Sequence, residues 1–247
     1  MLQPSDLRVQ IFADGADLNG ILNLYRNPLI QGFTTNPTLM RKAGIDNYEA
    51  FARKLLAAVP DRPISLEVFA DDLDEMESQA IEIASWGGKV NVKIPVTNTK
   101  GVSTAPIIAR LARAGVRLNV TALMTLDQVR RVVDCIAPAP ATSYISVFAG
   151  RVADTGRDPV PMMAEAVRIM APYRNLALIW ASPRELLNIF QADEIGCHVI
   201  TVTHDVLQKL SLVEKNLDQY SLETVQMFFD DARKAGFTLP AHHVVMS

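Results

Sequence analysis

Short apolar runs alternate with longer amphipathic segments along almost the whole chain. The runs are rich in Val, Ile and Leu, and most of them show no polar–apolar alternation, which is typical of parallel strands covered on both faces. Eight runs of this kind predict eight strands: Val9–Ala13, Gly32–Thr35, Ile64–Ala70, Val90–Val96, Arg117–Leu123, Tyr144–Ala149, Leu176–Ala181 and Val199–Thr203.

The segments between these runs carry apolar residues at helical spacing. They predict helices over Tyr48–Ala58, Leu73–Trp86, Thr104–Ala114, Leu126–Cys135, Met162–Ala171 and Arg184–Asp193, and a further helix over Leu222–Lys234. Strands that alternate with helices through 247 residues, without a flexible linker, predict one (β/α)8 TIM barrel forming a single domain over residues 1–247, with an additional C-terminal helix. A doubly wound open sheet is the alternative, but no Gly-x-Gly-x-x-Gly follows the first strand.

Composition narrows the class of protein further. The formal net charge is −3, and the charged residues are interspersed, so no nucleic-acid partner is expected. The two cysteines, Cys135 and Cys197, cannot form a disulfide framework, which favours a reducing cytosol. The first residues do not resemble a signal peptide, and no apolar run approaches the roughly 18 residues that span a bilayer. We therefore expect a cytoplasmic protein without a membrane partner.

Polar side chains interrupt the apolar pattern near the carboxyl ends of the predicted strands. In a barrel these ends lie together and form the rim of the active site. Nearly every strand from the first to the seventh contributes a polar group, and this convergence predicts an active site built from Asp14, Asn36, Glu67, Lys93, Asn119, Thr121, Ser146, Ser182 and Arg184.

Lys93 is the least expected of these residues, because it lies inside the apolar run Val90–Val96. Desolvating an unpaired ammonium group is costly, so such surroundings favour a partly neutral amine. A neutral amine can attack a ketone carbonyl and form a Schiff base. The alternative is a lysine at a strand end that extends its ammonium group into solvent.

Two carboxylates are candidate acid–base groups. Glu67 lies within an apolar strand, and buried carboxylates are usually paired or functional. The alternative role for Glu67 is a structural salt bridge, for which Lys93 is a candidate partner. Asp14 ends the first strand before Gly15 and could instead cap the following helix.

The later part of the chain contains a candidate phosphate site. Arg151 follows Phe148-Ala149-Gly150, and Ser182-Pro183-Arg184 follows the seventh strand, where we expect a helix to begin. A helix N-terminus with a hydroxyl and guanidinium groups binds phosphate well, and loops after the late strands of barrels commonly do so. The alternative is that Ser182 only caps the helix while Arg184 lies on the surface.

Other polar groups predict less. Thr203-His204-Asp205 is more typical of a helix cap than of a pair of metal ligands. His242-His243 has no further ligands nearby in the sequence, so neither a metal nor a cofactor is expected.

Taken together, these residues resemble the transaldolase family of Schiff-base aldolase barrels, in its compact branch close to the fructose-6-phosphate aldolase-like transaldolases. The resemblance runs in the family's order from the first strand to the seventh. It is carried by Ala13-Asp14, Thr34-Thr35-Asn36-Pro37, Glu67-Val68, Val92-Lys93-Ile94-Pro95, Asn119-Val120-Thr121, Ser146-Val147-Phe148-Ala149-Gly150-Arg151 and Ala181-Ser182-Pro183-Arg184.

The resemblance implies the catalytic roles. Lys93 would form the imine with the donor ketose, and Glu67 would shuttle protons through a water held with Thr121. Asp14 would take the proton from the C4 hydroxyl as the C3–C4 bond breaks and would then return it. The reaction implied is transfer of a dihydroxyacetone unit from sedoheptulose 7-phosphate or fructose 6-phosphate to an aldose phosphate.

The resemblance also implies the substrate-binding residues. The three-carbon unit would contact Asn36, Asn119 and Ser146, with Phe148 beside them, and the phosphate would contact Arg151, Ser182 and Arg184. Pro183 replaces the aromatic residue that usually separates the last two, which leaves the shape of this pocket open. Members of the compact branch tend to form homo-oligomers, including decamers, in which the C-terminal helix helps assembly.

Several alternatives remain at this point. Fructose-6-phosphate aldolases release free dihydroxyacetone, but typically carry glutamine in place of Glu67 and tyrosine in place of Phe148, so these positions favour a transaldolase. A specialised transaldolase acting on an unusual sugar would share the same core. A barrel that binds a sugar phosphate without catalysis would be expected to lose catalytic groups, yet Lys93 and Asp14 are present with Glu67. The preferred sugars and the pathway, pentose phosphate metabolism or a biosynthetic route, are left open.

Overall fold

The structure is a computed structural model that describes residues 4–87 and 89–239. By its internal contacts the chain divides into two compact units, Leu2–Leu210 and Ser211–Ser247, and each is described by itself. Within the described part of the chain, no helix is long and apolar enough to cross a membrane. The residues His242-His243 lie outside the described range.

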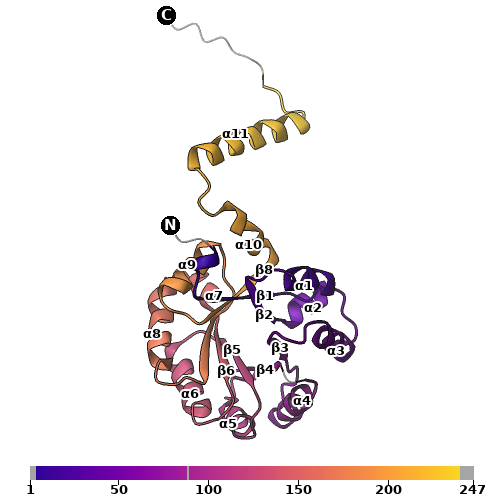
Figure 1. The fold of residues 1–247 in the computed structure, drawn as a ribbon, viewed down its shortest axis with the longest axis vertical. Helices are drawn as coiled ribbons and strands as arrows, with labels where there is room; N and C mark the ends of the chain where they lie inside the picture. The colour runs from indigo at the N-terminus through magenta and orange to yellow at the C-terminus, as the bar shows by residue number, and fades with distance from the viewer. Residues whose placement is uncertain (1–3, 88, 240–247) are drawn as a thin grey trace, which may run out of the picture. The chain divides into compact units, whose positions relative to one another are not determined.

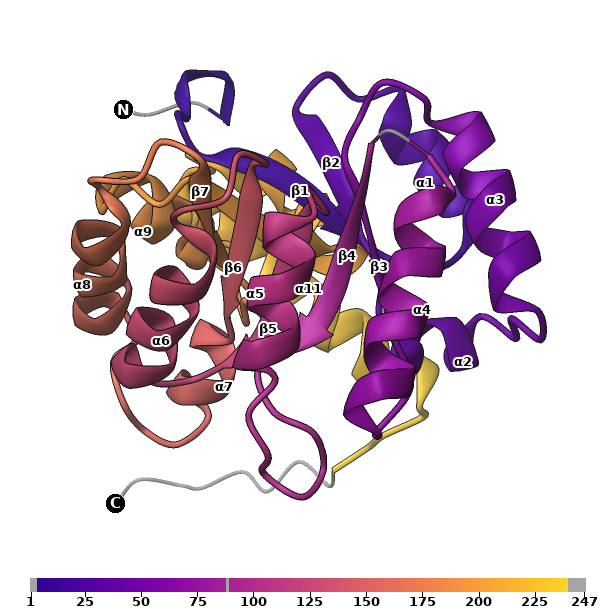
Figure 2. The same cartoon turned by 90° about the horizontal axis from the view of Figure 1, so that it is seen from below.

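Eight parallel strands of the first unit close into a barrel in sequence order (Figures 1 and 2). This confirms the predicted fold class. Seven of the predicted runs differ from the strands by up to three residues at an end, and the eighth coincides with its strand. The strands are β1 (Gln10–Asp14), β2 (Ile30–Thr34), β3 (Ile64–Glu67), β4 (Val90–Pro95), β5 (Leu118–Leu123), β6 (Ser143–Val147), β7 (Leu176–Trp180) and β8 (Val199–Thr203).

Helices follow the strands and surround the barrel (Figure 2). Five of them match predicted helices closely: α3 (Tyr48–Ala58), α4 (Leu73–Ser85), α5 (Ala105–Arg113), α6 (Leu126–Ile136) and α8 (Val160–Met170). The expected helix over Arg184–Asp193 begins later, as α9 (Leu187–Glu194). The short elements, which the apolar pattern does not reveal, are η1 (Pro4–Asp6), α1 (Leu18–Tyr25), α2 (Pro37–Lys42), α7 (Ala149–Ala153), α10 (His204–Gln208) and η2 (Lys209–Leu212).

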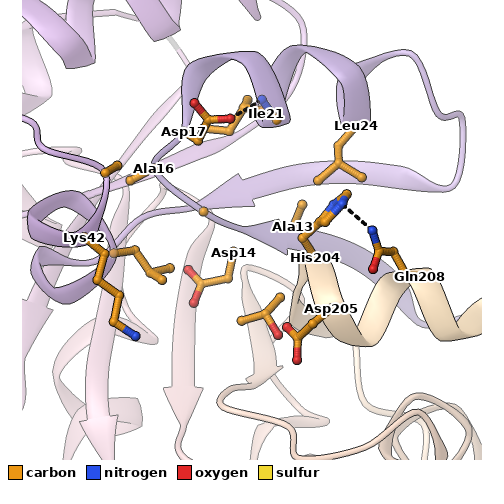
Figure 3. Close-up of a pocket in the computed structure, with 15 residues that line it drawn as sticks. Ala13, Asp14, Ala16, Asp17, Ile21, Leu24, Lys42, His204, Asp205 and Gln208 are labelled. Carbon is orange, nitrogen blue, oxygen red and sulfur yellow. Dashed lines mark hydrogen bonds between the residues drawn. The ribbon is translucent and has the colours of Figure 1, made fainter. Parts of the chain in front are cut away.

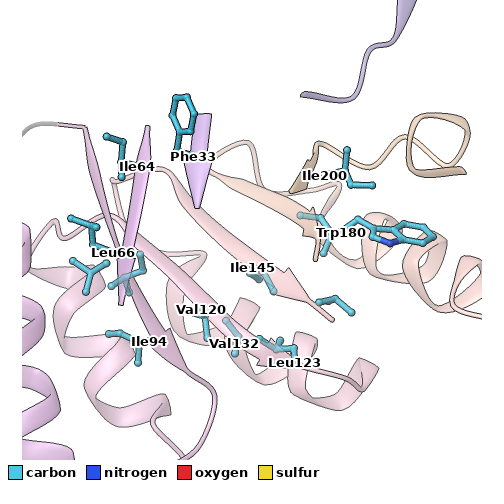
Figure 4. Packing of buried hydrophobic residues seen from close by; sticks show 14 of the residues in the cluster. Phe33, Ile64, Leu66, Ile94, Val120, Leu123, Val132, Ile145, Trp180 and Ile200 are labelled. Carbon is cyan, nitrogen blue, oxygen red and sulfur yellow. The ribbon is translucent and has the colours of Figure 1, made fainter. Parts of the chain in front are cut away.

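The main hydrophobic core lies between the strands and the helices, and Figure 4 shows part of it. Successive side chains of a strand point to opposite faces. In β4, Val92 and Ile94 belong to this core, so Asn91 and Lys93 face the inside of the barrel. Strand alternation therefore places the lysine inside the barrel, at the end where the loops lie.

A smaller apolar cluster fills the interior before the strands end. It contains Phe12, Ile179 and Val199, all fully or almost fully buried. Gly32 in β2 makes room for it, because a β-carbon at that position would lie only 2.6 Å from the Phe12 ring. The polar side chains at the strand ends thus rest on a packed apolar layer.

In the second unit, α11 (Leu217–Lys234) begins five residues before the predicted Leu222. Asn216 caps it by accepting a hydrogen bond from the backbone N–H of Gln219. Lys215 forms an ion pair with Glu223 within the same unit.

Candidate active site

A cavity of about 670 Å³ opens at the carboxyl ends of the strands. All eleven residues predicted for the site line it. The fold thus places them around one cavity, while their chemical roles stay predictions. They are Asp14, Asn36, Glu67, Lys93, Asn119, Thr121, Ser146, Phe148, Arg151, Ser182 and Arg184.

Lys93 and Glu67 form a buried ion pair in this cavity. They lie opposite each other in the register of β3 and β4, and their Nζ and Oε2 atoms are 3.0 Å apart. Lys93 is 6% exposed and also donates to the backbone carbonyl of Thr35 at 2.8 Å. The alternative of a lysine that extends into solvent is therefore wrong, whereas the predicted pairing with Glu67 is present. The pair places a proton acceptor next to the amine.

Three residues near the ion pair of Lys93 and Glu67 have unusual environments or conformations. Tyr48 of α3 donates to the backbone carbonyl of Glu67 at 3.0 Å, and burial raises the pKa of Tyr48, so its hydroxyl stays protonated. Thr121 Oγ1 is buried and has no hydrogen-bond partner among residues 4–87 and 89–239. Ala122, which follows it, has a φ of 65° where the register of β5 and β6 shifts. Such local strain commonly accompanies functional sites.

Asn119 and Ser146 form a buried hydrogen-bonded row beside the lysine. The Ser146 hydroxyl donates to Asn119 Oδ1 at 2.7 Å, and Asn119 Nδ2 donates to Ser65 Oγ at 2.9 Å. Asn119 is also the register partner of Lys93. Fixed amide and hydroxyl groups that line the same cavity as an amine can orient a hydroxylated substrate.

Asp14 is held by two hydrogen bonds and does not cap a helix. Its Oδ1 accepts from the Thr34 hydroxyl at 2.8 Å, and its Oδ2 accepts from Asn36 Nδ2 at 3.1 Å. Asp17 caps α1, so the alternative of Asp14 as a cap is wrong. Burial raises the pKa of Asp14, against the opposing effects of Lys93 and of the Thr34 hydrogen bond. A raised pKa makes the ionised carboxylate a stronger base, which suits a group that accepts and returns a proton.

Asn36 serves two neighbours. As the cap of α2 it accepts from the backbone N–H of Leu39 at 2.9 Å, and this leaves its amide nitrogen to reach Asp14. The following Pro37 occupies the first turn, where a missing N–H costs nothing. Local sequence rules thus place an amide at the edge of the cavity.

Arg184 is fixed by a carboxylate from a different βα unit. Its Nε donates to Asp154 Oδ1 at 2.8 Å, its Nη2 pairs with the other oxygen, and its Nη1 donates to Ser182 Oγ at 3.0 Å. The Arg184 hydrogen bond is the main reason that the pKa of Asp154 is lowered. The guanidinium and the serine hydroxyl therefore face the cavity together.

The expectation that Ser182 begins a helix is wrong. α9 starts at Leu187 with Leu186 at the cap position, and Ser182 lies earlier, in an irregular segment with a φ of 61°. Asn188 accepts from the backbone N–H of Arg184 at 2.8 Å instead. The candidate anion-binding groups here are thus a hydroxyl and guanidinium groups rather than a helix N-terminus.

Gly150 permits a close approach of two backbones. Its N–H donates to the carbonyl of Ala181 at 3.4 Å, and a β-carbon on it would lie 1.5 Å from the carbonyl oxygen of Ser182. Only glycine fits in this position. Gly150 therefore holds α7, which carries Arg151, against the segment that carries Ser182 and Arg184.

The cavity is also lined by polar residues that were not predicted for the site, namely Thr34 of β2, Thr201 and Thr203 of β8, and Asp205 of α10. Thr203 occupies the cap position of α10 as expected, but its hydroxyl bonds to Asp205, which lowers the pKa of that carboxyl. Threonine is common in strands, so its presence there gave no functional signal.

A second cavity of about 670 Å³ adjoins the first (Figure 3). The residues that line both cavities are Asp14, Leu39, Thr203 and Asp205. The second cavity extends toward Lys42 and the hydrogen-bonded pair of His204 and Gln208. No group of three His, Cys, Asp or Glu side chains in the described residues is arranged to hold a metal ion.

The fold and the cavity are those of the class of eight-stranded barrels in which polar groups at or just after the carboxyl ends of the strands line one cavity. The sequence model described as "Transaldolase/Fructose-6-phosphate aldolase" matches residues 11–244. The chain belongs to this transaldolase/fructose-6-phosphate aldolase family.

Individual relatives support this assignment. A "Probable transaldolase" of Dehalococcoides mccartyi is 34% identical over 82% of this chain and 90% of its own. Another "Probable transaldolase", of Thermoanaerobacter sp., is 31% identical over 94% of this chain and all of its own length.

Solved structures with lower sequence similarity share the fold. An HpcH/HpaI aldolase/citrate lyase family protein from Burkholderia cenocepacia has a TM-score of 0.57 at 15% identity and covers 90% of this chain and 98% of its own. Dihydrodipicolinate synthase from Rhodopseudomonas palustris has the same TM-score and identity, over 94% of this chain and 81% of its own.

Proposed function

We propose that this protein is a transaldolase that transfers a dihydroxyacetone unit between sugar phosphates through a Schiff base on Lys93. The observation that carries the proposal is the buried pair of Lys93 and Glu67, with Nζ and Oε2 3.0 Å apart, in the same cavity as the separately held carboxyl of Asp14. An amine with an adjacent proton acceptor and a second, independent acid–base group meets the requirements of imine-based carbon–carbon cleavage.

The first stage is formation of the imine. Lys93 gives a proton to Glu67, and its neutral nitrogen attacks the C2 carbonyl of the ketose. One proton moves from the attached nitrogen to the former carbonyl oxygen, and Glu67 returns to the same oxygen the proton that it took. The oxygen then leaves as water, and a protonated imine remains. The hydroxyl of Thr121, which has no hydrogen-bond partner in the described part of the chain, supports a role in holding the water that carries this proton.

The second stage is cleavage. Asp14 accepts the proton of the C4 hydroxyl, the C3–C4 bond breaks, and its electron pair moves toward the protonated imine to give an enamine. The aldose leaves, and an incoming aldehyde reacts in the reverse sense while Asp14 returns the proton. The raised pKa of Asp14 supports both directions of transfer.

The substrate phosphate binds at the other side of the cavity. Arg151 and Arg184 supply positive charge there, and the Ser182 hydroxyl, already bonded to Arg184, completes a set of donors. Charge-assisted hydrogen bonds from guanidinium groups suit a dianionic phosphate.

The test is to treat the protein with fructose 6-phosphate and borohydride, and then to locate the adduct by intact mass and peptide mapping. We expect a reduced three-carbon adduct on Lys93 and little free dihydroxyacetone. Adding erythrose 4-phosphate before borohydride is expected to remove the adduct and produce sedoheptulose 7-phosphate.

Other results would contradict the proposal in distinct ways. Abundant free dihydroxyacetone without an acceptor would identify an aldolase. An adduct only with other ketoses would identify a specialised transaldolase. If neither fructose 6-phosphate nor sedoheptulose 7-phosphate gave an adduct, the imine mechanism on these substrates would be wrong.

The phosphate site can be tested through Gly150. Gly150→Ala is expected to raise the KM for fructose 6-phosphate about tenfold or more, because the methyl group would overlap the carbonyl of Ser182 and push apart the two segments. Steady-state kinetics would measure this. Gly87→Ala is the matched control, since its β-carbon would meet only Leu56 at 3.9 Å. An unchanged KM in Gly150→Ala would show that this contact does not shape the phosphate site.

A further inference from the structure

The hydrogen bonds around Asp14 extend to the last strand of the barrel. The hydroxyl of Thr34, which donates to Asp14 at 2.8 Å, lies only 2.5 Å from the hydroxyl of Thr201 in β8. Thr34 is 3% exposed and Thr201 7%. The carboxyl thus ends a buried chain of two hydroxyl groups.

The closed barrel is what allows this chain to form. β1 pairs with β2 on one side and with β8 on the other. Asp14 is the register partner of Thr34, and Thr201 is the partner of Phe12, two residues earlier on the same face of β1. Side chains from strands far apart in the sequence therefore converge on one carboxyl.

The number of available hydrogen atoms determines which group donates in each of these hydrogen bonds. An ionised carboxylate has no hydrogen to donate, so the single hydrogen of the Thr34 hydroxyl points to Asp14. The oxygen of Thr34 must then accept from Thr201. Hydrogen bonds in such a chain strengthen one another in a low-dielectric interior, so donation from Thr201 makes Thr34 a better donor to Asp14.

We propose that Thr201 is a positioning residue for proton transfer by Asp14 and acts through Thr34. This inference rests on the proposed function, in which Asp14 is the base that drives carbon–carbon cleavage. Thr203, the neighbouring threonine on the same face of β8, forms a hydrogen bond with Asp205 instead, so it does not belong to this series of hydrogen bonds.

The test separates imine formation from cleavage. Thr201→Val keeps the shape of the side chain but removes the hydroxyl. We expect its rate of cleavage of fructose 6-phosphate to fall about tenfold, as for loss of one buried hydrogen bond, while borohydride trapping of the imine stays within about twofold of the wild-type value. The acidic limb of its pH–rate profile should move to higher pH, because the carboxylate form of Asp14 loses support.

Two further variants complete the design. Thr201→Ser restores the hydroxyl and should restore most of the rate. Thr104→Val is the matched control, because it removes another buried hydroxyl, which bonds to the carbonyl of Pro95 at 2.6 Å outside the cavity. If Thr201→Val does not fold, Thr201→Ala removes the same hydroxyl and carries the same expectation.

A normal cleavage rate with an unshifted acidic limb in the hydroxyl-free variant would overturn the inference. So would equal losses in imine trapping and cleavage, since these would show a merely structural role. The variant Asp14→Asn distinguishes a failure of the inference about Thr201 from a failure of the proposed function. If Asp14→Asn cleaves normally, the proposed role of Asp14 is wrong, whereas if it is slow and Thr201→Val is normal, only the role of Thr201 is wrong.

Discussion

Lys93→Met is expected to abolish the imine adduct and to lower transfer activity by about 10⁴-fold or more, as removal of a covalent nucleophile generally does. Methionine retains the length and apolar character of the side chain, so the cavity keeps its shape while the amine is lost. The measurements are borohydride trapping and coupled assay of sedoheptulose 7-phosphate formation. Lys89→Met, at an exposed lysine just before the same strand, is the matched control. Activity near the wild-type level in Lys93→Met would rule out a Schiff base on this lysine.

The same substitution leaves Glu67 without its partner. Removing one member of a buried ion pair typically costs about 3–5 kcal/mol of folding free energy, because the other charge stays desolvated. The side chain of Glu67 is 17% exposed, so we expect the loss of folding free energy to lie near the lower end of this range. Adding Glu67→Gln should recover stability without recovering activity, and chemical denaturation of the single and double variants would separate the two effects.

Asp14→Asn is expected to lower the rate of carbon–carbon cleavage by about 10²–10⁴-fold, the usual contribution of a positioned acid–base group. Imine trapping should persist, because that stage uses Lys93 and Glu67. Asparagine can still accept the hydrogen bond from Thr34, so the fold around β1 is retained.

The pH dependence provides a second reading of the Asp14 variant. Asp14 acts as a base in its ionised form, and burial raises its pKa above the ordinary range of aspartate. Activity of the wild-type protein should therefore fall as pH is lowered through that raised pKa, and the residual activity of Asp14→Asn should lack this limb. Asp17→Asn, at the exposed cap of α1, is the control. Normal cleavage in Asp14→Asn would assign the proton transfer to another group.

The parts of this fold that the sequence predicted are those with a continuous apolar signal. β8 and α3 coincide with their predicted ranges, because long apolar patterns reflect burial directly. α1 and α2 have eight and six residues, too few for a helical period to stand out. Lys93 was predicted as a site residue because desolvating an ammonium group inside an apolar run is costly, which disfavours a purely structural role there.

The failures have tertiary causes. Ser182-Pro183 resembles a helix start, with a capping hydroxyl before proline. In the folded chain, however, the contact with Gly150 holds this segment in an irregular conformation. Thr34 and Thr201 were not predicted for the site because threonine, a β-branched residue, is favoured in any strand. Its presence in a strand therefore does not indicate that its hydroxyl has a function.

The ion pair between Arg184 and Asp154 determines whether the side-chain entropy of Arg184 is lost on folding or on binding of an anion. An arginine free in solvent gives up about 1.5–2 kcal/mol of rotamer freedom when it becomes ordered. Here the carboxylate of Asp154, at the C-terminal cap of α7, and the hydroxyl of Ser182 restrict the guanidinium without any bound anion. That entropic loss belongs largely to folding, and an arriving anion meets donors whose orientation is already set.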